Sequence, residues 1–280
     1  MALNPDAVGK STKPLIHRCD DRSTILYALG VGATGRDDIE FLYEGFGPKV
    51  LPTYATVPFF DTFPELFALV GGDFAGVVHG AQSTRWFRPI RVNETFTVQG
   101  DVEGLYDLKR LATGTFAATI RAEDGEPVAE LKAEIVFRND GGFGGERPPH
   151  RERVTMPERA PDFVRREPIG DDQALLFRLS GDRNPLHADV ELAKRVGFHA
   201  PILHGLCTYG YIGRAVLSER CDNDPGRLKA LSGKFTKPVW PGETLIIEGF
   251  DVDDRVLLRV TTEERPQEVC FAEAWAEILR

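Results

Sequence analysis

The chain has 280 residues, of which 42% are hydrophobic and 28% charged, and its formal net charge is −9. This length is enough for two domains of ordinary size. The acidic balance argues against a nucleic-acid-binding protein, because phosphate binding needs lysine and arginine over a broad face. No apolar stretch approaches the roughly 20 residues of a membrane-spanning helix, and no signal peptide is evident. We therefore expect a cytoplasmic protein without nucleic-acid or membrane partners.

The first half of the chain contains two helix-like segments followed by three strand-like ones. An acidic residue begins the segment 21–30, where it favours the N-terminal end of a helix. The segment 50–60 has apolar residues at helical spacing. Polar and apolar residues then alternate over 95–102, 113–121 and 128–137, a pattern typical of antiparallel strands with one buried face.

The second half repeats this order. Acidic residues begin the helix-like segment 171–179, and 202–217 again has apolar residues at helical spacing. The second of these segments contains small residues that would let other backbone approach closely, namely Gly205, Cys207, Gly210 and Gly213. Strands are expected at 244–250, 256–262 and 270–279.

Short stretches of the two halves also match each other. Residues 87–95 (FRPIRVNET) compare with 236–244 (TKPVWPGET), and 27–32 compare with 177–182 at nearly the same offset. A helix followed by antiparallel strands, present twice, indicates an α+β chain of two similar domains.

A change in amino-acid composition marks the boundary between the two repeats. The segment 139–170 is rich in glycine, proline and charge and has no apolar period, which predicts an irregular linker. We place the N-terminal repeat at 1–138 and the C-terminal repeat at 171–280. The cysteines have no C-x-x-C spacing, so we expect reduced, mostly buried thiols and no disulfide framework.

The octet SGDRNPLH at 180–187 places a carboxylate, an amide and an imidazole around a proline. Pro185 lacks a backbone donor and restricts Asn184, so we expect a rigid loop and not a regular helix. Asp182 and His187 can then point into one small volume, where they could hold and polarise a water. Such a pair could perform general acid–base addition of water to a double bond, with Asn184 orienting it.

The alternative interpretation of this loop is structural. Asp182 would cap a helix that starts near Pro185. Asn184 would form an Asx turn, and His187 would only occupy the first helical turn.

The pair His204–Gly205 favours the functional interpretation. It stands directly before a helix, where unpaired N–H groups and the positive end of the dipole gather. A thioester carbonyl placed there would become more electrophilic, and an enolate oxygen would be stabilised. We therefore expect both residues to contact the substrate.

Other chemistries fit the sequence less well. A metal site is not expected, because the candidate ligands have a spacing that matches no common zinc pattern; they are His187, Asp189, His199 and His204. Ser180 does not lie in the G-x-S-x-G turn of a serine hydrolase.

Three stretches, FRLSGDRNPLH at 177–187, Gly197-Phe198 and PILHGLCT at 201–208, resemble the (R)-specific enoyl-CoA hydratases of the MaoC-like dehydratase family. Similar features cover most of the chain, at 26–33, 50–55, 141–145 and 235–244. One departure is Phe177, where the family motif often has tyrosine. The resemblance implies a double hotdog fold, in which each long helix is wrapped by a bent antiparallel sheet.

The same resemblance implies an enzyme of the hydro-lyase class, which reversibly hydrates trans-2-enoyl-CoA to (R)-3-hydroxyacyl-CoA without a metal or redox cofactor. By position, Asp182 and His187 would be the catalytic pair and Asn184 would shape the site. The N–H of Gly205 would donate to the thioester oxygen. The partner would be a small acyl-CoA, and a homodimer is plausible for this kind of fold. The alternatives are a hotdog acyl-CoA thioesterase and a non-catalytic acyl-CoA-binding subunit.

The N-terminal repeat should be catalytically silent, because Gly32 stands where the second repeat has Asp182 and no N-P-x-H follows. The resemblance implies that this repeat accommodates a bulky acyl group. Candidate residues for that cavity are Tyr54, Phe59 and Phe60, together with Tyr43, Phe46 and Phe63, unless the cluster is ordinary core. Candidates for contacts to CoA phosphates are Lys194, Arg195, Arg214, Lys234 and Lys237, unless these side chains are solvated surface.

Overall fold

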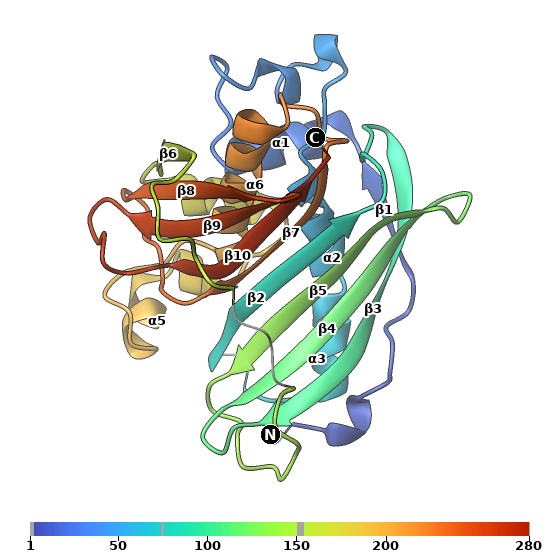
Figure 1. The fold of residues 1–280 in the computed structure, drawn as a ribbon. Helices are drawn as coiled ribbons and strands as arrows, with labels where there is room; N and C mark the ends of the chain where they lie inside the picture. Colours follow the sequence, from blue (N-terminus) through green and yellow to red (C-terminus); the bar gives the residue numbers. More distant parts are fainter. Residues whose placement is uncertain (1–2, 74–75, 150–153, 280) are drawn as a thin grey trace.

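The computed structural model describes residues 3–73, 76–149 and 154–279. Within these ranges, ten strands form a single antiparallel sheet in the order β1-β3-β4-β5-β2-β7-β10-β9-β8-β6 (Figure 1). The first half contributes β1 (Leu15–Cys19), β2 (Val77–Trp86), β3 (Glu94–Asp107), β4 (Ala112–Ala122) and β5 (Pro127–Phe137). The second half contributes β6 (Phe163–Pro168), β7 (Leu228–Phe235), β8 (Thr244–Val252), β9 (Arg255–Thr262) and β10 (Phe271–Ile278).

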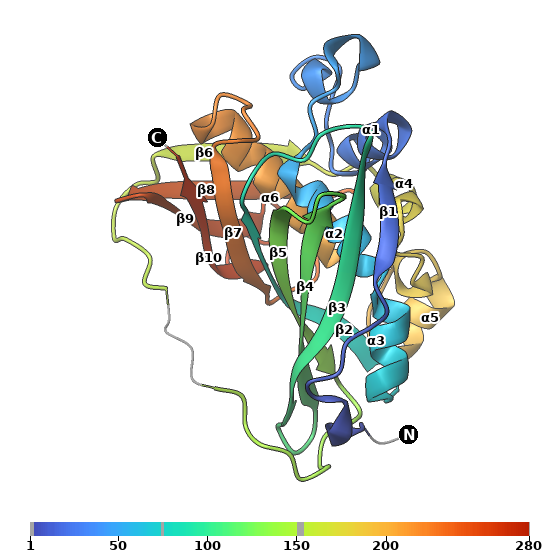
Figure 2. The ribbon, with the colours of Figure 1, turned by 90° about the vertical axis from the view of Figure 1, so that its right-hand side faces the viewer.

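The strand order is symmetric about its centre. β2 pairs with β7 there, with Ser83 opposite Ser232, and each half runs outward to a short edge strand, β1 or β6. Figures 1 and 2 show the cyan and green strands of the first half continuing across this seam into the orange and red strands of the second. The chain is therefore an α+β protein whose two similar halves share one sheet.

The helices lie behind this sheet in the view of Figure 1. The α-helices are α1 (Asp21–Gly30), α2 (Thr56–Phe60), α3 (Phe63–Val70), α4 (Gln173–Phe177), α5 (Val190–Arg195) and α6 (Gly205–Arg220). The short 3-10 helices are η1 (Pro5–Ala7), η2 (Ile39–Phe41), η3 (Glu44–Phe46), η4 (Pro52–Ala55), η6 (Arg178–Ser180) and η7 (Pro185–His187). In the described part of the chain, no helix has the length and apolar character needed to cross a membrane.

The long helix α6 forms the centre of the second half. Every residue from Leu206 to Leu217 is buried, as expected of a helix wrapped by a sheet. A Cβ atom at Gly210 would clash with the side chain of Val31, and one at Gly213 would clash with that of Thr53. These small residues therefore let segments of the first half pack directly against α6.

The corresponding helix of the first half is divided. The segment 50–60, expected to be helical, forms η4 and α2, and α3 follows as a separate piece. Pro64 explains the second interruption, because it cannot donate a hydrogen bond to residue 60 and its ring would clash with that carbonyl. The prediction of a helix was thus correct in type, but the helix is broken.

All strands predicted from alternation are present, whereas β1, β2, β6 and β7 were not predicted. β6 lies inside 139–170, so the prediction of an irregular linker is wrong at its C-terminal end. Residues 150–153 of that segment lie outside the described residues. The four cysteines are buried and free, as expected.

Arg214 joins α6 to both halves of the protein. Its guanidinium donates to Asp38 at 3.1 Å and to Glu167, and its Nε–H donates to the carbonyl of Val31 at 3.3 Å. The side chain is only 3% exposed. The prediction that Arg214 contacts CoA phosphates is therefore wrong, because its charge is buried and already neutralised by two carboxylates.

We expect Arg214→Met to lower the free energy of unfolding by about 3–5 kcal/mol, because the buried carboxylate of Asp38 would lose its cation and that of Glu167 would keep only its pairing with Arg165. Urea denaturation followed by circular dichroism measures this change. The exposed pair of Lys194 and Glu191 serves as a control, since Lys194→Ala should change stability by less than about 0.5 kcal/mol. A loss below about 1 kcal/mol in Arg214→Met would contradict the assigned role.

Candidate active site

The octet folds into a loop that hydrogen-bonds to itself. Gly181 has φ of 132°, a left-handed conformation that favours glycine. The Asp182 carboxylate accepts from the N–H of Asn184 at 3.0 Å, and the Asn184 side chain accepts from the N–H of Leu186 at 3.0 Å. Asn184 thereby caps η7. The predicted rigid loop is present, and the Asx turn of the structural alternative is part of what makes it rigid.

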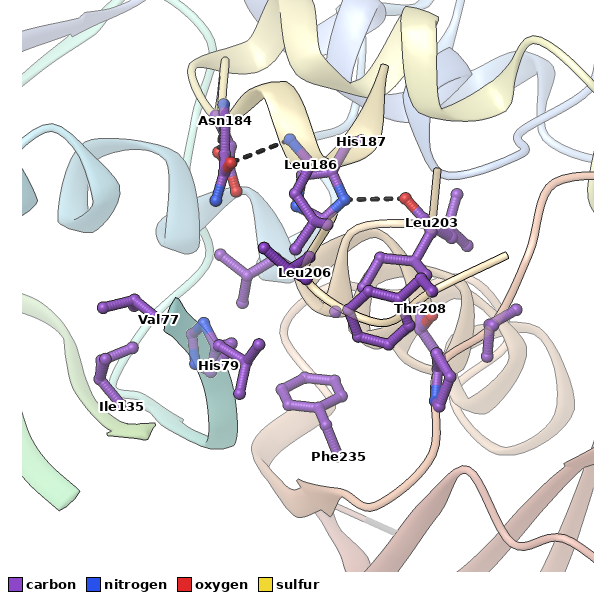
Figure 3. Close-up of a pocket in the computed structure, with 18 of the residues that line it drawn as sticks. Val77, His79, Ile135, Asn184, Leu186, His187, Leu203, Leu206, Thr208 and Phe235 are labelled. Carbon is purple, nitrogen blue, oxygen red and sulfur yellow. Dashed lines mark hydrogen bonds between the residues drawn. The ribbon is translucent and has the colours of Figure 1, made fainter. Parts of the chain in front are cut away.

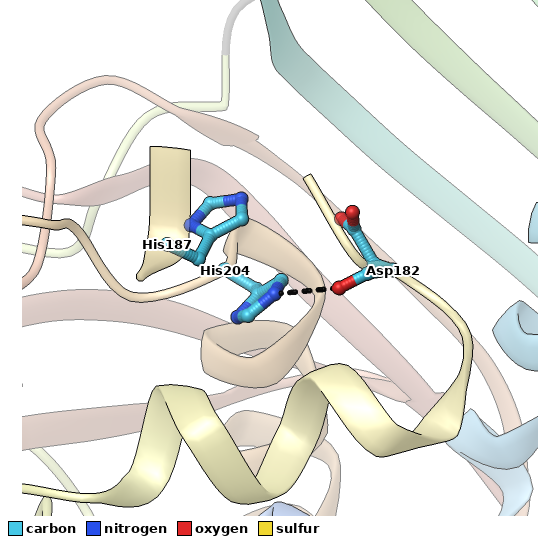
Figure 4. A group of neighbouring side chains, drawn as sticks. All are labelled: Asp182, His187 and His204. Atoms are coloured by element: carbon cyan, nitrogen blue, oxygen red, sulfur yellow. Dashed lines mark hydrogen bonds between the residues drawn. The ribbon is translucent and has the colours of Figure 1, made fainter. Parts of the chain in front are cut away.

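This loop places the carboxyl group of Asp182 next to two imidazoles. One potential ligand atom each from Asp182, His187 and His204 lies within 4.8 Å of the others (Figure 4). The Nδ1–H of His187 donates to the carbonyl oxygen of Ile202 at 2.8 Å. Because a carbonyl can only accept, neutral His187 carries its lone pair on Nε2, which leaves that nitrogen able to take a proton.

Burial acts on both members of the pair. It raises the pKa of the Asp182 carboxyl and lowers the pKa of the His187 imidazole, while the attraction between the two groups opposes each shift. The carboxyl group is held closer to its protonated form and the imidazole closer to its neutral form than in water. One group can therefore supply a proton while the other accepts one, as general acid–base chemistry requires.

A cavity of about 680 Å³ opens beside the pair. Its wall is mainly apolar and comes from both halves, including Phe63 and Phe67. Figure 3 shows Val77, Ile135, Leu206 and Phe235 of this wall. Asp182, Asn184 and His187 lie together among its polar lining residues. The cavity suits a ligand with a long apolar group and one reactive polar centre.

Gly205 lines this cavity as the first residue of α6. Its N–H has no acceptor within the helix and stands at the positive end of the helix dipole. A Cβ atom here would contact the ring of Phe235 at 3.4 Å, so glycine keeps the approach to this N–H open. The position suits a donor to an oxygen that gains negative charge.

The structure brings together only some of the predicted site residues. Those that line the cavity are Asp182, Asn184, His187, Gly205, Lys237 and Phe60. Phe63, from the wider aromatic cluster, lines it as well, whereas Tyr43 and Phe46 are exposed elsewhere.

Several predicted substrate contacts are wrong. Tyr54 and Phe59 are buried in the core of the first half, where Tyr54 donates to Ser23 at 3.0 Å. Lys234 pairs with Glu273 at 2.6 Å. The exposed side chains Lys194 and Arg195 lie on α5 and are not part of the cavity wall, and His204 is buried outside it.

Gly32, which stands where the second repeat has Asp182, has no room for a side chain. A Cβ atom there would clash with the ring of Tyr211 from α6. The space that a side chain at this position would need is therefore already filled.

Sequence reasoning missed the cavity residues that β2 supplies. His79 lines the cavity, and its Nε2–H donates to the carbonyl of Ala81 at 3.0 Å. Burial lowers its pKa to about 4, so the ring is neutral at physiological pH. No signal pointed to His79, because the alternation that predicts a strand is absent around it.

The cluster of Asp182, His187 and His204 is poorly arranged for a metal ion. The two rings stack with centroids 3.6 Å apart and planes at 26°. In-plane lone pairs of stacked rings run side by side and do not converge on one point.

Comparisons with known proteins match both halves of the chain. Residues 152–269 match the model described as MaoC like domain, and residues 17–139 match that of the MFE-2 hydratase 2 N-terminal domain. The 3-hydroxyacyl-thioester dehydratase Y of Mycobacterium tuberculosis is 40% identical, covering 88% of this chain and 86% of that protein. A probable enoyl-CoA hydratase 2 of Dictyostelium discoideum is 35% identical, covering 90% and 88%.

Solved structures share the fold over nearly the whole chain. A MaoC-like dehydratase from Phytophthora capsici superposes with a TM-score of 0.87 at 29% identity, covering 99% of this chain and 98% of that one. A Mycobacterium tuberculosis protein described as a double hotdog fold superposes with a TM-score of 0.59 at 14% identity, covering 96% and 95%. The predicted hotdog architecture is confirmed.

Neutral His79 should make the stability of the folded protein depend on pH. Its pKa falls from 6.5 to about 4 on folding, so between these pH values the unfolded chain binds a proton that the folded protein does not. The free energy of unfolding is therefore highest above pH 6.5, and this part of the stability is lost as the pH falls toward 4.

In His79→Phe this part of the decrease in the free energy of unfolding should disappear, because phenylalanine cannot take up a proton. Urea denaturation at several pH values across this range measures the change. The exposed His199 provides the control, because His199→Gln should keep the wild-type slope. An unchanged slope in His79→Phe would show that the ring is not held neutral.

Proposed function

The chain belongs to the MaoC-like dehydratase family, and from this membership we propose that it is an enzyme that hydrates trans-2-enoyl-CoA to (R)-3-hydroxyacyl-CoA and catalyses the reverse dehydration. The observation that carries the proposal is the pair of half-buried Asp182 and buried His187 at the edge of an apolar cavity, beside the first N–H of α6. The names of the relatives, an enoyl-CoA hydratase 2 and a 3-hydroxyacyl-thioester dehydratase, support the same substrate class.

The reaction needs one proton removed from water and one delivered to carbon. Water held between Asp182 and His187 loses a proton to one member of the pair, and its oxygen bonds to C3 of the enoyl group. The electrons of the double bond move toward the thioester, and C2 then takes a proton from the other member. Nε2 of His187 is available as an acceptor, and burial favours a protonated Asp182 as a donor.

Charge that develops on the thioester oxygen needs a donor already in place. The N–H of Gly205 fulfils this role in the proposal, because it has no helical acceptor and the α6 dipole adds to its positive potential. Asn184 holds the loop through its cap of η7 and so keeps the pair in place.

The acyl chain would extend from this point along the apolar wall into the first half of the molecule. Phe60, Phe63 and Phe67 form part of that wall, in the region where α2 and α3 replace a continuous helix. Lys237 lies exposed at the cavity and is the predicted CoA contact that this arrangement retains. A cytoplasmic location is supported by the four buried free cysteines, which suit a reducing compartment.

The test is the loss of enoyl-thioester absorbance when purified protein is added to crotonyl-CoA or a longer analogue. Asp182→Asn and His187→Gln should each lower kcat by roughly two to four orders of magnitude, the usual contribution of a general acid or base. Asp189→Asn is the matched control, because Asp189 caps α5 outside the cavity and asparagine also caps helices well.

Two outcomes would contradict the proposal. Near-full activity in Asp182→Asn would remove the acid–base pair from the mechanism. Release of free thiol at the rate of substrate loss, detected with a thiol reagent, would indicate a thioesterase instead.

A further inference from the structure

His204 contacts both members of the Asp182–His187 pair without lining the cavity. Its Nε2 lies 3.1 Å from the backbone oxygen of Asp182, and its ring stacks on His187 with centroids 3.6 Å apart. The residue is 1% exposed. Figure 4 shows the imidazole beside His187, with its hydrogen bond directed at the backbone of Asp182. It therefore touches the acid–base pair and not the substrate.

We propose that His204 is a positioning residue that sets the distance and orientation between Asp182 and His187. The inference rests on the proposed function, in which these two groups must face one water. Asp182 and His187 belong to a loop whose regular structure is limited to short 3-10 helices, whereas His204 is the N-cap of the long helix α6. His204 thereby ties the loop to the long buried helix of the second half.

The hydrogen bond defines the state of the ring. Because the carbonyl of Asp182 can only accept, Nε2 of His204 carries the proton and Nδ1 carries the lone pair. Nδ1 is buried, and no described residue hydrogen-bonds to it. Burial and the neighbouring His187 hold the pKa of His204 well below its ordinary value, so the ring stays neutral.

A neutral ring is what the stack needs. When His187 takes a proton during the reaction, a second cation on its face would repel that charge. An uncharged, polarisable ring at 3.6 Å tolerates the cation and prevents His187 from tilting. The stack thus restrains the ring of His187, and the hydrogen bond restrains the backbone of Asp182.

Contacts with Phe177 and with the first turn of α6 hold His204 in place. The ring of Phe177 lies 5.0 Å from that of His204 at an angle of 54°. The N–H groups of Cys207 and Thr208 donate to the His204 carbonyl at 3.1 and 3.2 Å. The side chain therefore has little freedom to move, which a positioning role requires.

The first half contains the matching aromatic pair without the histidine. Tyr27 and Tyr54 have the same separation in sequence as Phe177 and His204, and their rings meet edge to face at 5.6 Å. An aromatic pair at this place is thus common to both halves. At the position of His204 the first half has the phenol of Tyr54, so the imidazole in this place of the pair accompanies Asp182, which supports a role tied to the reaction.

Two variants separate the contacts of His204. His204→Phe keeps a ring against His187 but loses the donor, and His204→Gln keeps an N–H donor at similar reach but loses the stack. We expect kcat for crotonyl-CoA to fall by on the order of 10²-fold in at least one variant, the usual cost of a displaced catalytic group. KM should change by less than about twofold, because His204 does not touch substrate.

The pH profile gives a readout that lost packing alone would not produce. The titratable groups facing His187 are Asp182, Arg178 and the neutral His204. In His204→Gln the ring of His187 becomes less buried, so the acid limb of kcat/KM should move to higher pH. In His204→Phe the ring stays covered and this limb should not move. His17→Gln, the same change outside the cavity, should leave kcat unchanged.

The outcomes distinguish the two proposals. If wild-type protein hydrates crotonyl-CoA and Asp182→Asn does not, but both His204 variants keep kcat within about threefold of wild type, the positioning role is overturned alone. It is also overturned if kcat falls only in proportion to folded protein measured by circular dichroism. Absence of hydration by the wild-type protein overturns the proposed function and this inference together.

Discussion

Close packing around α6 is the constraint on which the rest of the molecule depends. The helix is buried along nearly its whole length, and Gly210 and Gly213 allow segments of the first half to reach its surface. The thiol of Cys207 donates to the carbonyl of Gly30 at 3.3 Å, which adds a further contact between the halves. Because the helix cannot shift within this packing, the N–H of Gly205 and the side chain of His204 at its start are fixed in space.

The two halves use the same elements for different purposes. In the second half a continuous helix supports the loop that carries Asp182 and His187, and burial shifts the pKa of each of these two groups. In the first half the helix is broken at Pro64, and Tyr211 fills the space beside Gly32. A broken helix leaves room for a cavity wall of phenylalanines. Phe60, Phe63 and Phe67, which come from this broken region, line the cavity.

The loop of the candidate site could be predicted from the sequence better than its surroundings. The octet has strong local constraints from Pro185 and Gly181, so its loop and its pair of catalytic candidates could be predicted. Strand β2 could not be predicted, because it pairs with a strand on each side and buries polar side chains such as Gln82. Its sequence therefore lacks the alternation of polar and apolar residues that indicates a strand. The partners of Arg214 and the stacking of His204 come from distant parts of the chain, and nothing in local sequence identifies them.

The seam between β2 and β7 has a consequence for how such a protein can be divided. Each of these strands hydrogen-bonds to the other half along one side, from Ala81 to Arg85 and from Ala230 to Lys234. If the two halves were separated, these N–H and C=O groups would lose their hydrogen-bond partners, and β2 or β7 would become an exposed edge strand. Such edges recruit other strands, so the isolated halves would tend to aggregate or pair with copies of themselves. Covalent linkage in one polypeptide keeps the unlike halves together and excludes the like pairs.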